Sequence, residues 1–330
     1  KQTSHVLADS GGFQIASGKL EITDDQQRED IYNWQSNHSD YGMTLDVPAK
    51  AIENEESPYK TFTECLNNTI EHVESYERYR EQKSFPLLNV LQGRDQQEAD
   101  DWYKGVKRFH FDGWAIAGPH RLDLYYVIRR MLILIDEGRL NYNESWVHFL
   151  GLGRFKVITL LSIIRDCVRR KLNDDGIHFS CDTSSPGLLA GKYRGVYTEV
   201  NFTPKNFTVK SEEVPFKDAK YLGSTEPFAY PISPIGKLLT MGDLIVKTGT
   251  HMNSRLDMLS AAMLMNHNTY VYSQAILKAH QEVAKPRGLT MDTLPVSIYE
   301  AKCAIEDIFD AKDMWKELKK RKVVLDRVGS

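Results

Sequence analysis

Residues with chemically useful side chains or backbone groups stand at the ends of short apolar runs, far apart in the sequence. They are Asp9, Asp46, Gln92, Gly118 and Asp182. Carboxylates transfer protons or attack as nucleophiles, and an amide offers both a hydrogen-bond donor and an acceptor. A glycine lets a backbone N–H come close to a ligand. Together these groups suit the recognition and chemistry of a polar, planar molecule.

The apolar runs have the length and composition of buried β-strands. There are six, at residues 5–14, 42–48, 87–93, 113–118, 147–153 and 176–182. A helix-like stretch follows each run but the last, with Asp24, Ser57-Pro58 and Asp95 as the expected beginnings of three of them. Strictly alternating strands and helices predict parallel strands joined by right-handed crossovers. Since the carboxyl ends of such strands form one mouth, the five residues are expected to face one another.

The number of strand–helix units leaves two architectures open. A (β/α)8 barrel of the TIM type needs eight units, whereas this sequence contains six. Either two units precede Lys1 in a longer protein, or the sheet is open.

The amino-acid composition and the pattern of apolar residues change after Asp182. Residues 187–253 are rich in Gly, Pro, Thr and Lys, and are predicted to form an inserted region of short strands and loops that could contact nucleic acid. Residues 254–330 return to helical periodicity, with Ser254 capping one long helix and a second helix over roughly 293–322. We therefore divide the chain into barrel units with the catalytic strand ends (1–186), this insertion, and C-terminal helices that pack on the barrel (254–330).

Length, net charge, cysteine spacing and the lengths of the apolar runs limit the classes of protein to which this chain could belong. A chain of 330 residues with 41% hydrophobic residues can bury a full core, and its net charge of −3 gives no overall footprint for nucleic acid. The four cysteines form no Cys-x-x-Cys pair, which favours a reducing compartment and argues against a cysteine-built zinc site. No run approaches the roughly 18 apolar residues of a membrane span, and the start lacks a signal-peptide profile. We expect a cytoplasmic protein without membrane contact.

Each candidate residue also has a structural interpretation. Asp9 and the glycines after it could form a capped tight turn, or a ligand site in which Phe13 stacks on a planar molecule. Asp46 could cap the next helix or accept a ligand. Gln92 is costly to bury unpaired and suits the edge of a purine-like base. Asp182 stands where barrel enzymes place a nucleophile or a base.

Two other residues are assigned structural roles. Cys181 is interpreted as a small buried strand residue, because no histidine stands where it would obviously activate the thiol. His267 is interpreted as a packing or hydrogen-bonding residue, since no cysteines accompany it as metal ligands.

Taken together, the order of the motifs resembles the tRNA-guanine transglycosylase superfamily. The similar segments, which cover most of residues 5–186, are Asp9-Ser-Gly-Gly-Phe-Gln14, Leu45-Asp-Val-Pro48, Val90-Leu-Gln-Gly93, Gly113-Trp-Ala-Ile-Ala-Gly118 and Phe149-Leu-Gly-Leu-Gly153. His267-Asn268 resembles a pair in the family's late helix. In that family the Asp-Ser-Gly-Gly strand is the third of the barrel. The resemblance therefore implies a (β/α)8 barrel with strands 3–8 in this chain and strands 1–2 upstream of Lys1.

Departures from the family's pattern indicate a distant branch. The acid follows the cysteine in Ser180-Cys-Asp182, whereas the family's nucleophile precedes it, and the family's Cys-x-Cys-x-x-Cys zinc cluster is absent. Ala117-Gly118 replaces a glycine pair, and Pro119 replaces a leucine. Relatives that insert 7-deazaguanine bases into DNA, from phages and bacterial modification systems, resemble this form better than tRNA enzymes do.

The resemblance implies exchange of guanine in DNA for a free 7-deazaguanine base, 7-cyano-7-deazaguanine (preQ0), without a cofactor. Asp182 would be the nucleophile and Asp9 the proton-transfer group. The base would be bound by Asp46, Gln92, Gly118, Phe13, Leu150 and Gly151. Lys192 and Arg194 would contact the nucleic acid, and no metal is expected.

Three alternatives stay open at this point. The substrate could be tRNA, or the chain could be a non-catalytic partner subunit of a transglycosylase. A different barrel enzyme, such as a lyase or a phosphate-sugar isomerase, would need a phosphate loop, for which Gly151-Leu-Gly153 is the candidate. Association into a homo-oligomer is also left open.

Overall fold

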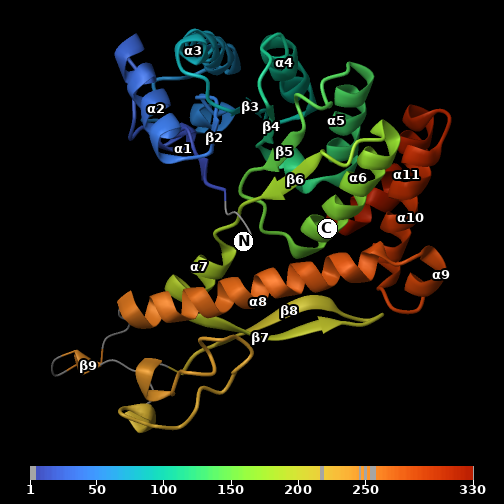
Figure 1. The fold of residues 1–330 in the computed structure, drawn as a ribbon. Helices are drawn as coiled ribbons and strands as arrows, with labels where there is room; N and C mark the ends of the chain where they lie inside the picture. Colours follow the sequence, from blue (N-terminus) through green and yellow to red (C-terminus); the bar gives the residue numbers. More distant parts are fainter. Residues whose placement is uncertain (1–4, 216–218, 245–246, 249–250, 253–257, 330) are drawn as a thin grey trace. The chain divides into compact units, whose positions relative to one another are not determined.

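The computed structural model describes residues 5–215, 219–244, 247–248, 251–252 and 258–329. The chain divides into two compact units (Figure 1). Unit 1 comprises residues 1–152, 164–182 and 304–330, and unit 2 comprises residues 153–163 and 183–303.

Unit 1 contains a six-stranded parallel sheet whose strands lie side by side in chain order. The strands are β1 (Leu7–Ala8), β2 (Tyr41–Met43), β3 (Leu87–Leu91), β4 (Gly113–Ile116), β5 (Trp146–Phe149) and β6 (His178–Cys181). Each neighbouring pair is parallel. The predicted six parallel strands are therefore confirmed.

The sheet is curled into a half-barrel. The rings of Tyr41 in β2 and Trp146 in β5 meet edge-on with their centroids 4.5 Å apart, although β3 and β4 lie between their strands. An apolar layer gathers side chains from across the sheet, namely Met43, Leu88, Val90 and Ala115, with Leu7, Trp146 and Leu150 packed against them. The described residues thus supply a curled sheet of the barrel type with six strands, and a closed eight-stranded barrel is not seen in them.

Helices connect successive strands of this sheet. The longer ones are α2 (Asp25–His38), α3 (Phe62–Gln82), α4 (Gln96–Val106), α5 (Leu124–Asp136) and α6 (Phe155–Leu172), with short helical segments α1 (Gly12–Ala16), η1 (Ala49–Glu53) and η2 (Pro119–Leu122). Figure 1 shows α2, α3, α4 and α5 following one another along one side of the strands.

The expected helix beginnings are right in two cases and wrong in one. Asp24 accepts a hydrogen bond from the backbone N–H of Gln27, and Asp95 accepts one from that of Glu98. Helix α3 does not begin at Ser57-Pro58. Its N-cap is Thr61, which forms a reciprocal capping box with Glu64, and this pairing satisfies two backbone donors of the first turn.

Unit 2 is built around a hairpin and one long helix. The hairpin consists of β7 (Gly195–Phe202) and β8 (Phe207–Glu213), and the helix is α8 (Met258–Ala284). The remaining elements are α7 (Ser185–Gly191), η3 (Ala219–Tyr221), η4 (Gly242–Leu244), β9 (Lys247–Thr248), β10 (His251–Met252) and α9 (Arg287–Thr290). The expected capping residue Ser254 lies outside the described residues.

Two buried side chains of α8 hold the helix to the hairpin. The ring nitrogens of His267 lie 2.7 Å from the Ser233 hydroxyl and 2.9 Å from the carbonyl oxygen of Tyr197. Asn268 accepts from the N–H of Tyr197 and donates to the carbonyl of Gly195. His267 therefore has the packing and hydrogen-bonding role that its sequence context indicates.

The single helix expected over roughly 293–322 is in fact two helices. They are α10 (Val296–Asp310) and α11 (Met314–Gly329). Asp313 separates them, because its carboxylate accepts from the backbone N–H of Lys316 and begins a new helix. Trp315 donates to Asp136 at 2.7 Å, which ties α11 to α5 within unit 1. Among the described residues, no helix combines the length and apolar character that crossing a bilayer requires.

Candidate active site

The first group of predicted residues meets at the ends of β1, β2 and β3. This acid cluster consists of Asp9, Ser10, Asp46 and Gln92. The side-chain nitrogen of Gln92 donates to Oδ2 of Asp46 at 2.8 Å, and the Ser10 hydroxyl lies 3.5 Å from Oδ1. Asp46 is 4% exposed, whereas Asp9 is exposed to solvent. A buried carboxyl group and a carboxamide are thus paired at the mouth of the sheet.

The surroundings of Asp46 change its proton affinity. Burial raises the pKa of Asp46, the hydrogen bond from Gln92 lowers it, and the nearby charge of Asp9 raises it, with a result of about 7. Asp46 can therefore gain or lose a proton near neutral pH. A carboxyl group in this range is suited to proton transfer or to proton-dependent recognition.

Glycines shape the loop that follows β1. A Cβ on Gly12 would lie 2.7 Å from Oδ1 of Asp46, and Gly11 has a φ of +88°. Larger residues would be strained at Gly11 and would collide with the carboxylate at Gly12. Beneath this loop, the buried amide of Gln35 donates to the carbonyl oxygens of Asp9 and Met43. The ends of β1 and β2 are therefore held in place by hydrogen bonds from the Gln35 side chain to their backbone carbonyl oxygens.

Gly93 and Gly118 bring the ends of β3 and β4 into close contact. Gly118 has a φ of +75°, and a Cβ there would lie 2.5 Å from the carbonyl oxygen of Gly93. Gly93 has a φ of +142°, and a Cβ there would lie 2.5 Å from the backbone nitrogen of Ala99. Both positions require glycine. The predicted site residues Gln92 and Gly118 consequently stand at adjacent strand ends.

The second group meets at the ends of β5 and β6. This Asp182 cluster consists of Trp146, His148, Gly151, Ser180 and Asp182. The backbone N–H of Gly151 donates to Oδ1 of Asp182 at 2.7 Å, and the Nε2 atom of His148 lies 3.2 Å from the same oxygen. The Asp182 side chain is 56% exposed, whereas that of His148 is 5% exposed. A buried ring thus supports an accessible carboxylate.

Hydrogen bonds favour the ionised form of Asp182. Partial burial would raise the pKa of this carboxyl group, but the hydrogen bonds from His148 and from the Gly151 N–H outweigh it, so the pKa lies below its ordinary value. Asp182 is ionised at neutral pH. An ionised and accessible carboxylate is a competent nucleophile. The two clusters therefore hold carboxyl groups in different protonation regimes at the same end of one parallel sheet.

His148, Ser180 and Trp146 were not identified from the sequence. His148 and Ser180 are cross-strand partners in the parallel pairing of β5 and β6. His148 precedes Leu150 by two residues, and Ser180 precedes Asp182 by two. Strand alternation places each such pair on one face of its own strand, so the spacing indicates the face, whereas the contact between His148 and Ser180 depends on the register of β5 against β6.

The remaining base-binding candidates occupy accessible positions. Phe13 lies on α1 and is 71% exposed. Leu150 is half-buried and packs against the apolar layer of the sheet. Gly151 has a φ of +61°, and its N–H is already used by Asp182. Gly151 is therefore placed to hold the carboxylate.

Both nucleic-acid candidates lie in unit 2, between α7 and β7. Lys192 is exposed, with Nζ 5.4 Å from the centroid of the Tyr193 ring. The guanidinium of Arg194 lies 4.0 Å from Glu213. Phe207 of the same insertion is 3% exposed and packs against Phe155 and Phe202, so its ring is not available for stacking on a base.

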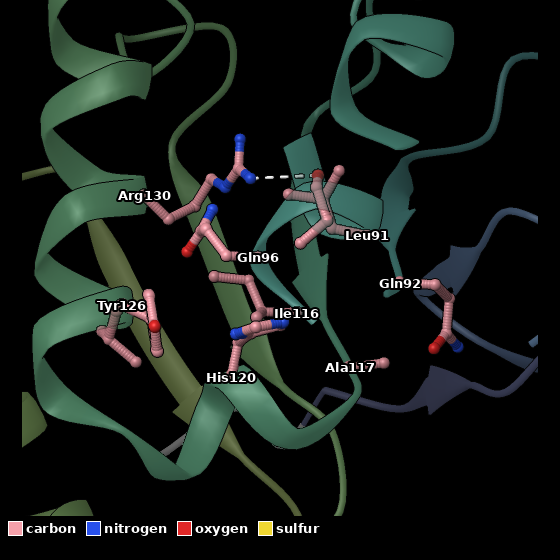
Figure 2. Close-up of a pocket in the computed structure, with 10 residues that line it drawn as sticks. Leu91, Gln92, Gln96, Ile116, Ala117, His120, Tyr126 and Arg130 are labelled. Atoms are coloured by element: carbon pink, nitrogen blue, oxygen red, sulfur yellow. Dashed lines mark hydrogen bonds between the residues drawn. The ribbon is translucent and has the colours of Figure 1, made fainter. Parts of the chain in front are cut away.

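A small pocket lies near the acid cluster at the ends of β3 and β4 (Figure 2). Its lining includes Leu91, Ile116, His120, Tyr126 and Arg130. Figure 2 shows the Gln92 side chain turned away from these residues, in keeping with its hydrogen bond to Asp46. Gln92 is itself one of the lining residues, so the pocket adjoins the Asp46–Gln92 pair.

Cys181, the cysteine beside Asp182, is poorly suited to act as a nucleophile. All four cysteines are free thiols, and burial raises the pKa of Cys181 to about 11. Within the same described ranges, no group of three or more His, Cys, Asp or Glu residues is arranged to hold a metal ion. The chemistry available at the strand ends is that of carboxyl groups, an amide and an imidazole.

Comparison with known proteins assigns no function to this arrangement. No family model matches the chain, and no curated protein matches it significantly. Functional assignment therefore rests on the residues of the two clusters and their contacts.

Proposed function

We propose that this protein is a transglycosylase that exchanges guanine in DNA for a free 7-deazaguanine base, 7-cyano-7-deazaguanine (preQ0). The observation that carries the proposal is the pair of clusters at one end of a curled parallel sheet. One holds an ionised, accessible carboxylate at Asp182, and the other holds the buried Asp46–Gln92 pair. The order of motifs along the chain resembles that of the tRNA-guanine transglycosylase superfamily. In this proposal the six strands belong to a (β/α)8 barrel.

The acid cluster suits the hydrogen-bonding edge of a guanine-like base. Such a base offers donors at N1 and at its exocyclic amine, and an acceptor at O6. The Asp46 carboxylate would accept the donors, while the Gln92 amide and the Gly118 N–H would donate to O6. Adenine has an acceptor at N1, so it would face a second acceptor and be rejected. Phe13 and Leu150 would flank the ring.

The Asp182 cluster suits displacement at the sugar. The target nucleotide would leave the base stack, and an Asp182 oxygen would form a bond to C1′ as the C1′–N9 bond breaks. The electron pair would go to guanine, which takes a proton as it departs. The incoming deazaguanine would lose its N9 proton and attack C1′, which breaks the C1′–oxygen bond and restores the carboxylate. Asp9, an exposed carboxyl group whose charge acts on Asp46, would carry these protons, and no cofactor is needed.

Unit 2 is proposed to contact the polynucleotide through Lys192 and Arg194. The same chemistry on tRNA is the second candidate. The joint presence of Asp9, Asp46, Gln92 and Asp182 disfavours a non-catalytic partner subunit. A phosphate-binding enzyme is disfavoured too, because the Gly151 N–H donates to Asp182 and would not be available to a phosphate.

An incorporation assay tests this function. Labelled preQ0 is incubated with the protein and with duplex DNA, single-stranded DNA or tRNA, and label in the polymer is measured together with released guanine. We expect equal amounts of label gained and guanine released with DNA. Incorporation into tRNA alone would support the second candidate, and incorporation into none would overturn base exchange.

A further inference from the structure

A chain of three hydrogen bonds leads from the interior of the half-barrel to Asp182. The indole N–H of Trp146 donates to the hydroxyl oxygen of Ser180 at 2.6 Å. That hydroxyl lies 2.8 Å from Nδ1 of His148, and Nε2 of His148 lies 3.2 Å from Oδ1 of Asp182. All four residues belong to β5, to β6 or to the position that directly follows β6.

With a neutral His148 ring, the chemistry of the four groups gives every hydrogen bond a direction. The indole can only donate, and an ionised carboxylate can only accept. In the neutral imidazole, Nε2 must therefore carry the proton that faces Asp182, which leaves Nδ1 as an acceptor. The Ser180 hydroxyl then donates to Nδ1 while it accepts from Trp146. Because His148 is only 4% exposed, solvent has little access to reverse this order.

We propose that His148 is a positioning residue for Asp182, and that Trp146 and Ser180 hold its ring as the Nε2–H tautomer. The inference rests on the proposed role of Asp182 as the nucleophile. The Gly151 N–H and the His148 Nε2–H both donate to Oδ1 of the carboxylate. The other oxygen, Oδ2, is then the atom that attacks C1′.

The two donors act differently on the two halves of the exchange. Once Oδ2 is bonded to C1′, Oδ1 becomes the carbonyl oxygen of an ester. Hydrogen bonds to an ionised carboxylate are about twice as strong as those to a neutral acceptor. The donors therefore stabilise the carboxylate more than the ester. They favour breakage of the C1′–Oδ2 bond when N9 of the incoming base attacks, and the bonding pair returns to Asp182.

Other titratable groups near Asp182 do not share this role. Cys181 adjoins it but stays a neutral thiol, since burial raises the pKa of Cys181 to about 11. Arg121 of η2 donates to the carbonyl oxygens of Gly118 and Gly151. His178 lies on β6, two residues before Ser180, and is exposed. Asp9 and Asp46 lie at the ends of β1 and β2.

Nuclear magnetic resonance of the substrate-free protein directly tests this chain of hydrogen bonds, which we call the relay. Imidazole ¹⁵N shifts report the tautomer of His148, and the Asp182 ¹³Cγ shift reports the midpoint of its titration. We expect the Nε2–H tautomer in the wild type and a mixture of tautomers in Ser180→Ala. The Asp182 midpoint should move to higher pH in His148→Phe, whereas the control His178→Phe should leave it unchanged. An Nδ1–H tautomer, or an unmoved midpoint in His148→Phe, would overturn the proposal.

Covalent trapping tests the consequence for the exchange. In His148→Phe, the fraction of protein bound covalently to DNA at steady state should rise about five- to tenfold relative to free carboxylate, because one donor to the carboxylate is lost. His148→Gln keeps an N–H donor at this reach and should restore much of the wild-type ratio, with free-base affinity equal in all variants. A wild-type adduct fraction in His148→Phe would overturn the role in the exchange. If the wild type itself exchanges no base, the proposed function fails, while the resonance experiment still decides the relay.

Discussion

Gln92 donates from its side-chain amide to the carboxyl group of Asp46 at 2.8 Å, across the ends of two adjacent parallel strands. Burial of this carboxyl group raises the pKa of Asp46 to about 7, although the hydrogen bond acts against that rise. The pair therefore combines an amide held in place by a hydrogen bond with a carboxyl group that gains or loses a proton near neutral pH. Recognition of a base by this pair would consequently depend on the protonation of Asp46.

Removing either member of the pair should weaken binding of the free base. We expect Gln92→Ala and Asp46→Ala each to cost roughly 1–3 kcal/mol, the usual penalty for leaving a polar partner unpaired. Because the ionised Asp46 accepts the donors of the base, affinity in the wild type should rise as pH increases through about 7. Calorimetry at pH 6 and pH 8 measures both effects. Wild-type affinity in both variants would place the base elsewhere.

The polynucleotide surface is tested by neutralising two charges. The double variant Lys192→Gln with Arg194→Gln should lower DNA affinity and flatten its dependence on salt, since fewer counterions are released on binding. Lys210→Gln is a matched control, because Lys210 already pairs with Glu199 at 2.6 Å. Fluorescence anisotropy over a salt series gives both quantities. An unaltered salt slope in the double variant would leave this surface without a role.

Stability should fall in mild acid because of a buried histidine in α3. Burial, and then the charge of Arg28, lower the pKa of His72 to about 4. The unfolded chain takes up this proton below about pH 6.5, whereas the folded protein does not until about pH 4. The contribution of His72 is therefore complete above pH 6.5 and is lost between pH 6.5 and 4, by on the order of 2–3 kcal/mol.

Substitution of His72 should reduce the loss of stability in mild acid. The free energy of unfolding of His72→Leu should fall less between pH 7 and pH 5 than that of the wild type. Asp46 acts in the opposite sense, because its raised pKa adds stability as pH falls from about 7, so the comparison is made between variants. The exposed His178→Leu should keep the wild-type slope. Equal slopes in wild type and His72→Leu would contradict the assignment.

The purified protein should carry no stoichiometric zinc. The described residues bring no three potential ligands together, and both ring nitrogens of His267 are already hydrogen-bonded. Elemental analysis after purification without chelators measures the metal content. About one zinc ion per chain would contradict this expectation.

The sequence predicts strand ends well and contacts between strands poorly. Asp46, Gln92 and Asp182 each follow an apolar run, and a parallel sheet brings such ends to one edge whatever the detailed pairing. His148 and Ser180 lie inside their strands. Their meeting depends on the register of β5 against β6, which no local pattern specifies.

Helix boundaries show the same limit. Ser57-Pro58 has the composition of a helix start, yet the reciprocal bonds of Thr61 and Glu64 begin α3 later. Asp313 interrupts what looks like one continuous helical periodicity, because its carboxylate caps α11. In both places the helix propensities of neighbouring residues are similar, and a specific side-chain hydrogen bond determines the residue at which the helix begins.

Detection of the proposed covalent bond between Asp182 and DNA is the most direct test of base exchange. The protein is incubated with guanine-containing DNA without free base, denatured and digested, and the adducted peptide is identified by mass spectrometry. We expect the adduct on Asp182. Asp182→Asn should lose both the adduct and base exchange but should still bind free base. The exposed control Asp175→Asn should retain both the adduct and base exchange. An adduct on another residue, or undiminished exchange by Asp182→Asn, would contradict the proposed function.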